Sequence, residues 1–437
     1  MTLPFSAVAN AAQIETTIRR NRLLDLPASW QDEIIYPHFG GLSIYNVAQT
    51  VAGLFGLPAG SPLDPAIWVQ ESALADIVRI VLIITDGLGY KLLNTLMEED
   101  EDLRTAVYDL TDGRGPIPLT SVAPSTTAVA LPTIWTATMP STHGLLGTTL
   151  FLREFAVLAN MLAYKAMASP EPREALTAWG LPTEDFVPVA SLGQLLNTVA
   201  VPTHLLLDKD LLGSGLSKFM HRGIDNRHIH VGLNDIWLRL CDVLTDTVGQ
   251  RCFVSTYWPA VDALSHLYGM WSPYLRDEVR RQMMALRDVL TSSAVSDGQT
   301  LVMILADHGH LDVANPLRLD QEKHLQPIQD AMRFPFSGDK RFSQIYLREG
   351  QKQRVIETLL RDFSAQLTWV EPAIALESQL FGTGSVHPEF FHRTGDLTII
   401  SRMGTCLYDN YRDRLPVSAH GGLSEWEMIV PLLWKRI

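Results

Sequence analysis

The sequence predicts an α/β protein whose mostly parallel, doubly wound sheet lies between layers of helices. Three continuous apolar runs, at 80–84, 301–305 and 397–400, have the length and composition of buried strands and end in polar residues or glycine. Helical patterns lie between them, as at 274–290, where apolar residues recur every three or four positions. Strands that alternate with helices favour a parallel sheet, whose ligands gather beyond the carboxyl ends of the strands.

Composition limits the functions that the chain can have. Hydrophobic residues make up 46% and charged residues 19% of 437 residues, which supports a large buried core and excludes a mainly disordered chain. The formal net charge is -13, from 35 Lys+Arg and 48 Asp+Glu, so we expect no broad nucleic-acid surface. A phosphate-ester substrate would then need a local positive field, and metal ions could supply it.

The order of the elements predicts one large domain with an insertion. Residues 1–70 contain many Pro and Gly and are expected to wrap the main domain as an N-terminal segment. Residues 71–315 and 396–437, with a further strand at 252–257, are expected to form the main domain. Between these, 344–347 and 367–370 resemble strands that flank a helical pattern at 352–363. We therefore predict a small α+β subdomain at 316–395 that caps the main domain.

The cysteines and the N-terminus predict a compartment. Cys241, Cys252 and Cys406 include no close pair, so buried thiols are expected rather than disulfides or a thiolate metal site. The N-terminal residues lack the basic start and apolar run of a signal peptide. The densest apolar run, 77–84, is interrupted by Arg79 and is too short to span a bilayer. We expect a cytoplasmic protein with no membrane contact, and the sequence is silent on its oligomeric state.

Acidic and imidazole side chains follow two of the predicted strands. Asp86 stands directly after 80–84 and precedes two glycines, while Asp307 and His308 follow 301–305. A neighbouring Asp and His offer one oxygen and one nitrogen to the same ion, a mixture that suits zinc or manganese. The alternative is that both Asp residues cap helices and that His308 is solvated.

Two further motifs carry the same residue types. Asp262 and His266 are four positions apart, so on a helix they project from one face and can hold one ion. His420 precedes a glycine pair near the C-terminus. A surface hydrogen-bonded pair and a loop imidazole are the alternatives, but the six Asp and His residues together favour a metal centre.

A hydroxyl motif completes the set. Residues 124–127 read Pro-Ser-Thr-Thr and precede an Ala-rich stretch, which is typical of a helix N-cap. A helix N-terminus stabilises a bound phosphate, and a metal-bound threonine there can act as an alkoxide nucleophile. The alternative is that the hydroxyl groups only cap the helix, which Pro132 would weaken.

These motifs, in this order, resemble those of the type I phosphodiesterase/nucleotide pyrophosphatase family of the alkaline phosphatase superfamily. The matching pieces are Thr85-Asp86-Gly87, Pro124-Ser125-Thr126-Thr127 with His143-Gly144 downstream, Tyr257-x4-Asp262-x3-His266-x2-Gly269, Ala306-Asp307-His308-Gly309 and Ala419-His420-Gly421-Gly422. The resemblance implies two divalent ions, zinc or else manganese, about 4 Å apart. It implies one ion on Asp86, Thr127, Asp307 and His308, and another on Asp262, His266 and His420. It also implies that Thr127, sixteen residues before His143, is the nucleophile.

One position departs from the family pattern. Thr148 stands where nucleotide pyrophosphatases of the family usually carry an Asn that helps to hold the phosphoryl oxygens. A hydroxyl group cannot reproduce the geometry of an amide, so specificity for nucleotide diesters is in doubt while the metal chemistry is retained. We therefore expect a two-metal phosphohydrolase that cleaves a phosphodiester or pyrophosphate bond of a small-molecule phosphate ester through a phosphothreonine. The alternatives are a phosphomonoesterase or phosphomutase-like enzyme of the superfamily, or a catalytically silent metal-binding module.

Overall fold

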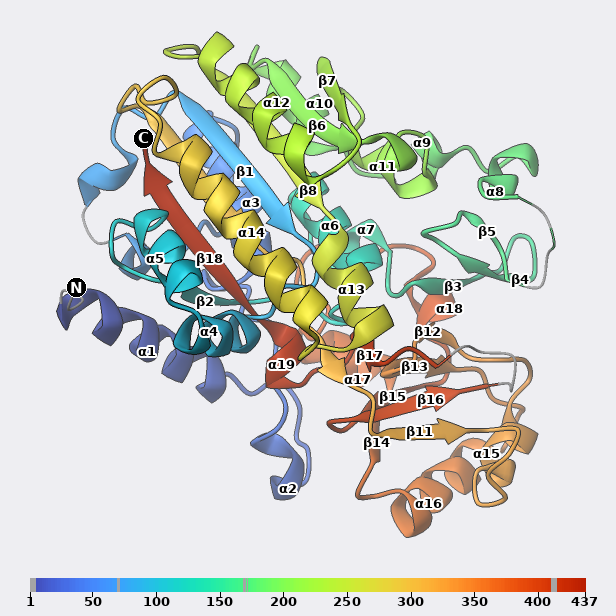
Figure 1. The fold of residues 1–437 in the computed structure, drawn as a ribbon. Helices are drawn as coiled ribbons and strands as arrows, with labels where there is room; N and C mark the ends of the chain where they lie inside the picture. Colours follow the sequence, from blue (N-terminus) through green and yellow to red (C-terminus); the bar gives the residue numbers. More distant parts are fainter. Residues whose placement is uncertain (1–4, 69–70, 168–169, 171, 410–414) are drawn as a thin grey trace.

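A computed structural model describes residues 5–68, 71–167, 170, 172–409 and 415–437 of the chain. The main sheet has seven strands in the order β2-β18-β9-β1-β8-β6-β7 (Figure 1). At its centre β1 pairs in parallel with both β8 and β9, and β18 runs antiparallel to β9 and β2. The predicted mostly parallel α/β sheet is confirmed. Its strands are β1 (Arg79–Thr85), β2 (Ile117–Thr120), β6 (Thr203–Asp208), β7 (Asn226–His230), β8 (Cys252–Trp258), β9 (Thr300–Leu305) and β18 (Ile429–Arg436).

The central strands are buried along their whole length, which explains their continuous apolar sequences. Every residue of β1 and of β9 is buried. Helices cover both faces of the sheet: α14 contacts α5, α12 and α13 on one side, and α3, α6 and α10 contact one another on the other side (Figure 1). The bounds of these helices are α3 (Ile44–Leu54), α4 (Tyr90–Glu99), α5 (Glu101–Asp109), α6 (Thr127–Thr136), α10 (Leu192–Thr198), α12 (Leu233–Asp246), α13 (Ala260–Tyr268) and α14 (Pro273–Leu290).

A second sheet of seven antiparallel strands lies beside the main one, in the order β14-β15-β13-β12-β3-β4-β5 (Figure 1). Two helices, α15 and α16, contribute to its own apolar core. The bounds are β3 (Thr149–Leu152), β4 (Val157–Asn160), β5 (Lys165–Ala166), β12 (Ser337–Asp339), β13 (Phe342–Ile345), β14 (Leu367–Val370), β15 (Leu397–Ser401), α15 (Gln326–Ala331) and α16 (Lys352–Asp362).

The second sheet extends beyond the segment 316–395 that the sequence set apart. The strand that we expected in the main domain at 397–400 is β15, which pairs with β13 and β14 of the second sheet. Residues 149–166 supply three more of its strands. Apolar content alone marked 397–400 as a buried strand, but both sheets have buried strands, so that pattern could not assign it to one of them.

Short elements connect the two sheets. Strand β10 pairs with β17, and β11 pairs with β16. Residues 311–318 are therefore paired with residues 405–419, which follow much later in the chain. The bounds are β10 (Leu311–Asp312), β11 (Asn315–Arg318), β16 (Thr405–Tyr408), β17 (Ser418–Ala419), α7 (Pro140–His143), α8 (Ala175–Ala178), α9 (Thr183–Phe186), α11 (Gly215–Met220), α17 (Pro372–Glu377), α18 (Phe390–Thr394), α19 (Glu425–Met428), η1 (Pro65–Ile67), η2 (Glu71–Leu74) and η3 (Lys209–Leu211).

The N-terminal segment is part of the folded molecule. Helix α1 (Phe5–Arg20) contacts β2, α2 spans Ala28–Gln31, and α3 is largely buried against α6. Residues 1–4 and 69–70 of this segment lie outside the described residues. Among the described residues all three cysteines are free, with Cys252 and Cys406 buried and Cys241 partly exposed. Within the same described ranges, none of the helices combines the length and apolar character needed to cross a membrane.

Candidate active site

The predicted ligands meet at one edge of the main sheet because neighbouring parallel strands end there. The backbone N–H of Asp86, after β1, donates to the carbonyl oxygen of Trp258 at the end of β8 (3.0 Å). The N–H of Asp262 in turn donates to the carbonyl oxygen of Asp86 (3.0 Å). Gly87 has φ 79°, and a Cβ there would lie 2.9 Å from the Cα of Asp262. This close approach explains the glycine after Asp86.

One cluster combines Asp86, Asp307 and His308, whose ligand atoms all lie within 4.8 Å of one another. The Oδ1 atom of Asp307 accepts the N–H groups of Gly87 (3.2 Å) and His308 (2.9 Å). Its Oδ2 atom is buried and accepts no hydrogen bond from the described residues. That atom lies 3.5 Å from Nε2 of His308, which is 3.3 Å from Oδ1 of Asp86. A buried carboxylate oxygen without a hydrogen bond costs free energy of folding, and a bound cation would offset that cost.

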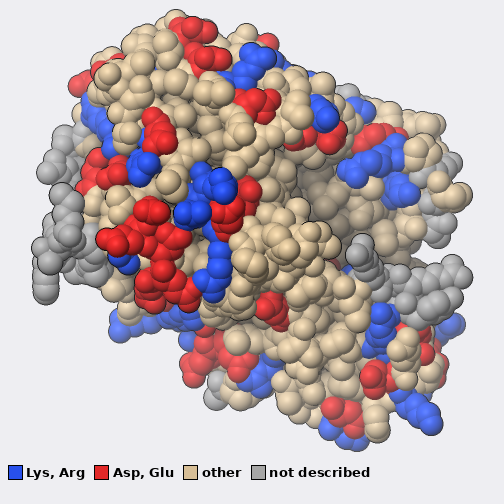
Figure 2. Space-filling view, in the orientation of Figure 1, with Lys and Arg blue, Asp and Glu red and all other residues tan. Residues whose placement is uncertain are grey.

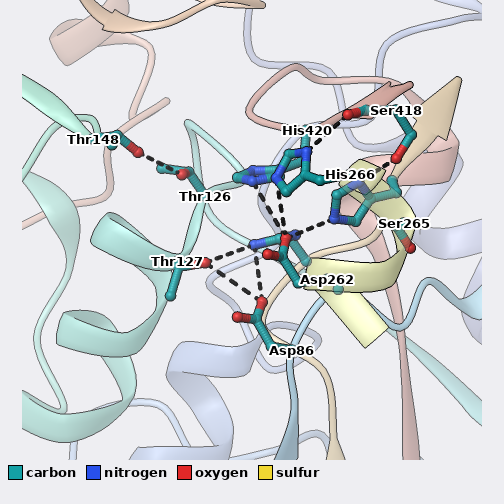
Figure 3. Close-up of polar contacts among 12 residues, drawn as sticks. Asp86, Thr126, Thr127, Thr148, Asp262, Ser265, His266, Ser418 and His420 are labelled. Atoms are coloured by element: carbon teal, nitrogen blue, oxygen red, sulfur yellow. Dashed lines mark hydrogen bonds and ion pairs between the residues drawn. The ribbon is translucent and has the colours of Figure 1, made fainter. Parts of the chain in front are cut away.

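Thr127 lies next to this cluster at the first position of α6. Its Oγ1 is 3.0 Å from Nε2 of His308 and 3.4 Å from Oδ1 of Asp86 (Figure 3). Thr126 is the N-cap residue, and its hydroxyl points away, toward Oγ1 of Thr148 at 3.0 Å. The helix continues through Pro132 and is buried along its whole length, so that proline does not end it.

A second cluster forms around Asp262. As predicted, Asp262 and His266 share one helix, α13, and Nε2 of His266 lies 3.4 Å from Oδ1 of Asp262. Nε2 of His420 lies 3.6 Å from the same oxygen (Figure 3). Two ligands of a tetrahedral ion with bonds of ~2.0–2.1 Å stand roughly 3.3–3.4 Å apart, so these spacings suit a shared ion. The C-terminal loop thus reaches a helix that lies 150 residues earlier in the chain.

Each of the three predicted histidine ligands has its Nδ1 atom facing a backbone carbonyl. The partners are the carbonyl oxygens of Ser418 for His266 (2.8 Å), of Gly309 for His308 (3.1 Å) and of Ser125 for His420 (3.3 Å). Because a carbonyl oxygen only accepts, each Nδ1 carries the proton and each Nε2 presents a lone pair to the centre. Histidines that bind metals are oriented in this way.

The electrostatics of the site favour the binding of cations. Burial, together with the nearby Asp307 and Asp262, raises the pKa of Asp86 well above its ordinary value. Burial and the neighbouring His308 lower the pKa of His420 well below its ordinary value. Burial opposes ionisation of Asp262 as well, but the hydrogen bond from His310 and the other histidines lower its pKa. Divalent cations would reverse the penalty on the carboxylates and keep the imidazoles neutral.

Thr148 lies at the predicted substrate-binding position, and an unpredicted acid supports it. Its backbone N–H donates to Oδ2 of Asp339 (3.1 Å), and the hydroxyl of Thr126 donates to Oδ1 of the same carboxylate (3.3 Å). Burial raises the pKa of Asp339. Two hydroxyl groups and a carboxyl group therefore lie together around position 148.

The site opens into a cavity of about 950 Å³. Thr127, Asp262, His266 and His420 lie at one end of it. Figure 2 shows the molecule hollowed between α13 and the second sheet, with few charged side chains on the visible walls. Most of the wall is apolar and comes from the second sheet and the loop before β12: Phe151, Val157, Leu158, Leu162, Met167, Phe334 and Phe336.

Three side chains of this site had no role in the sequence predictions. Tyr257 donates its hydroxyl to Oδ2 of Asp86, and Asp339 and His310 lie in contact with the predicted residues. His310 had a signal, since it follows His308 by two residues after the same strand. Asp339 had none, because it comes from the second sheet and no local pattern links it to residue 126 or 148.

Comparisons with known proteins give a family match and similar folds. A family model described as type I phosphodiesterase / nucleotide pyrophosphatase matches residues 220–423. That range includes Asp262, His266, Asp307, His308 and His420, while Asp86 and Thr127 precede it. No curated protein matches the chain.

Solved structures share the fold. Murine ectonucleotide pyrophosphatase / phosphodiesterase 5 superposes with a TM-score of 0.58 at 12% identity, covering 81% of this chain and 87% of that one. Its inactive threonine-to-alanine variant in complex with AMP gives 0.57 at 12% identity, over 81% and 87% of the two chains. Phosphonoacetate hydrolase from Sinorhizobium meliloti 1021 in complex with phosphonoformate gives 0.57 at 14% identity, over 82% and 90%. At such identities the likeness establishes the fold, which is the alkaline phosphatase-like one that the motifs implied.

Proposed function

We propose that the chain is a two-metal phosphohydrolase of the type I phosphodiesterase/nucleotide pyrophosphatase family, whose model matches residues 220–423. It would cleave a phosphodiester or pyrophosphate bond through a phosphothreonine at Thr127. The observation that carries the proposal is the pair of carboxylate and imidazole clusters with Thr127 beside one of them.

The residues present fit two divalent ions, zinc or manganese. Asp86, Thr127, Asp307 and His308 would hold one, and Asp262, His266 and His420 the other. The orphaned Oδ2 of Asp307 and the inward Nε2 atoms supply the donors that such ions take. When bound, the ions would polarise the phosphoryl group and lower the pKa of the threonine hydroxyl.

Thr127 would attack the phosphorus through Oγ1. A bond from Oγ1 to phosphorus forms, the bond from phosphorus to the leaving oxygen breaks, and the threonine proton passes to solvent or to the leaving group. The first turn of α6 begins at Thr127, so its backbone N–H groups stand ready for the phosphoryl oxygens. Water then attacks the phosphothreonine and restores the hydroxyl. The inactive threonine-to-alanine variant among the structural neighbours supports a threonine in this role.

The size of the cavity favours a phosphate ester with a large organic group over a small monoester. Its volume of about 950 Å³ would hold a group as large as a nucleoside, and its walls are mostly apolar. A structural neighbour was solved with AMP, and another, phosphonoacetate hydrolase, with phosphonoformate. Because the walls of the cavity are mostly apolar, we propose a diester or pyrophosphate whose organic group is less polar than a nucleotide.

Metal analysis combined with a substrate panel tests the proposed function. Purified protein should carry close to two ions per chain, a chelator should abolish hydrolysis, and zinc or manganese should restore it. Diesters with aryl or alkyl groups should be cleaved faster than the corresponding monoesters. Protein that binds no ions and hydrolyses at an unchanged rate in chelator would refute the proposal. Faster cleavage of monoesters would favour the phosphomonoesterase alternative.

A further inference from the structure

Four histidines, not three, surround Asp262. His310 is fully buried in the short segment between β9 and β10, and its Nε2 lies 2.7 Å from Oδ1 of Asp262. Its ring centre lies 4.7 Å from that of His266 and 4.9 Å from that of His420. Asp262, His308, His310 and His420 together form a group whose ligand atoms lie within 4.8 Å of one another. Proximity alone would therefore make His310 a metal ligand.

The distances separate His310 from the three ligand histidines. Nε2 of His266 and of His420 lie 3.4 and 3.6 Å from Oδ1 of Asp262, which suits two ligands of one ion. The corresponding atom of His310 is at 2.7 Å, which is a hydrogen-bond distance and shorter than the separation of two ligands. His310 is therefore bonded to the carboxylate itself.

The contact between His310 and Ser418 indicates which ring nitrogen of His310 carries the proton. Nδ1 of His310 faces the hydroxyl of Ser418 at 3.0 Å, whereas Nδ1 of each ligand histidine faces a carbonyl oxygen. A hydroxyl group can donate, so it can leave Nδ1 as the acceptor and the proton on Nε2. The His310 ring would then donate Nε2–H to Asp262, and an imidazole that donates through Nε2 has no lone pair there for a metal.

We propose that His310 is a positioning residue that holds the carboxylate of Asp262 in place for the second ion, through the chain Ser418–His310–Asp262. Ser418 has two tasks in this arrangement, because its carbonyl oxygen also accepts Nδ1–H of His266 at 2.8 Å. A carboxylate oxygen has lone pairs for both an ion and one hydrogen bond. Partners that orient a metal ligand typically change metal affinity by about 10- to 100-fold when removed. The inference rests on the proposed two-metal site.

Two substitutions of His310 distinguish a positioning residue from a metal ligand. His310→Phe keeps the bulk of the ring and removes the donor, whereas His310→Gln keeps an N–H at similar reach. The matched control is His230→Phe in β7, because His230 is equally buried and neither of its ring nitrogens has a partner within the described residues. The probe is Co²⁺ or Zn²⁺ added to metal-free protein, with both dissociation constants measured by calorimetry and the Co²⁺ absorption spectrum recorded.

The expected result is two ions in the wild type and a 10- to 100-fold weaker binding of one of them in His310→Phe. Binding of the other ion should be unchanged, and His310→Gln and His230→Phe should behave as the wild type. Should His310→Phe fail to fold, Ser418→Ala should weaken the same ion. Loss of one ion from both His310 variants, with an altered Co²⁺ spectrum, would make His310 a ligand and overturn the inference. Unchanged binding in every variant would also overturn it, whereas a wild type without ions would instead refute the two-metal proposal.

Discussion

The two threonines at the start of α6 are chemically identical and differ only in what surrounds them. Oγ1 of Thr127 lies 3.0 Å from His308 and 3.4 Å from Asp86, whereas Oγ1 of Thr126 bonds to Thr148 and Asp339. Family spacing favoured Thr127 in the sequence, and the local pattern could not separate the two. The structure places only Thr127 beside the predicted ligands.

Substitution of each threonine tests their roles. Thr127→Ala should fold and bind two ions but lose nearly all turnover, because it lacks the oxygen that attacks phosphorus. Thr126→Ala should retain most of the activity and lose about 1 kcal/mol of stability, since it removes a buried hydroxyl that bonds to Thr148 and Asp339. Steady-state kinetics and metal analysis of both variants make the comparison. A Thr127→Ala protein with near-normal turnover, or label from substrate found on Thr126, would contradict the assignment.

At the scale of elements, the site depends on a contact between the second sheet and the C-terminal loop. Arg341, just before β13, donates Nε to Oε1 of Glu427 (2.6 Å) and Nη2 to Oε2 (2.9 Å), and both side chains are fully buried. Glu427 also accepts the N–H of Gly422 (2.7 Å), two residues after His420. The pair therefore fixes the loop that carries a predicted ligand.

Breaking this buried pair should be costly. Arg341→Met leaves Glu427 buried without its cation, and the free energy of unfolding should fall by about 3–5 kcal/mol. The double variant Arg341→Met/Glu427→Gln should recover part of this loss, because no uncompensated charge remains. Denaturant titrations of the wild type and of both variants measure the difference. If the single variant were as stable as the wild type, the pair would not hold the loop in place.

The strands β3–β5 are expected to set substrate preference through the apolar wall of the cavity. Leu158→Gln keeps the size of the side chain but makes the wall polar, so KM for aryl or alkyl diesters should rise about tenfold. Metal content should not change, because Leu158 lines the cavity without being one of the proposed ligands. Leu360→Gln on the exposed face of α16 is the matched control. Equal KM values for Leu158→Gln and the control would show that the substrate does not contact this wall.

The sequence predicted individual elements better than their assembly. The strands at 80–84, 252–257 and 301–305 and the helix at 274–290 are present because continuous apolar runs and helical spacing are local properties. The strand at 397–400 also formed, but in the second sheet, since pairing depends on distant residues. Strands β6 and β7, which form one edge of the main sheet, are partly polar, and no pattern indicated them.

Across the whole molecule, the order of the motifs predicted the residues of the site, whereas the domain boundaries were predicted less completely. Seven ligand candidates from five distant regions of the chain converge at one edge of the main sheet, where the parallel strands β1, β8 and β9 end. Asp339 could not be predicted, because the second sheet that carries it borrows strands from residues 149–166. A local pattern can reveal a residue's chemistry, but only the fold reveals its partners.

Buried histidines should make the stability of the metal-free protein depend on pH. Burial lowers the pKa of His143 and His221 to about 3, and that of His310 to about 4. Because these folded-state values lie below the unfolded value of about 6.5, the stabilisation is complete above pH 6.5 and is lost as the pH falls toward 3–4. The raised pKa of Asp86 acts in the opposite direction, so a variant is needed to isolate the histidine effect.

His221→Phe supplies that comparison. Between pH 6.5 and 5 the His221 contribution should fall by on the order of 2 kcal/mol, so the variant should lose that much less stability than the wild type. Urea denaturation at the two pH values measures it. Identical pH dependence in the two proteins would mean that His221 accepts a proton without cost in the folded state.

Anomalous diffraction from a crystal grown with zinc would locate the two ions proposed to lie beside Thr127. We expect two peaks per chain, one among Asp86, Thr127, Asp307 and His308 and one among Asp262, His266 and His420. A single peak, or peaks only at surface residues, would contradict the two-metal site.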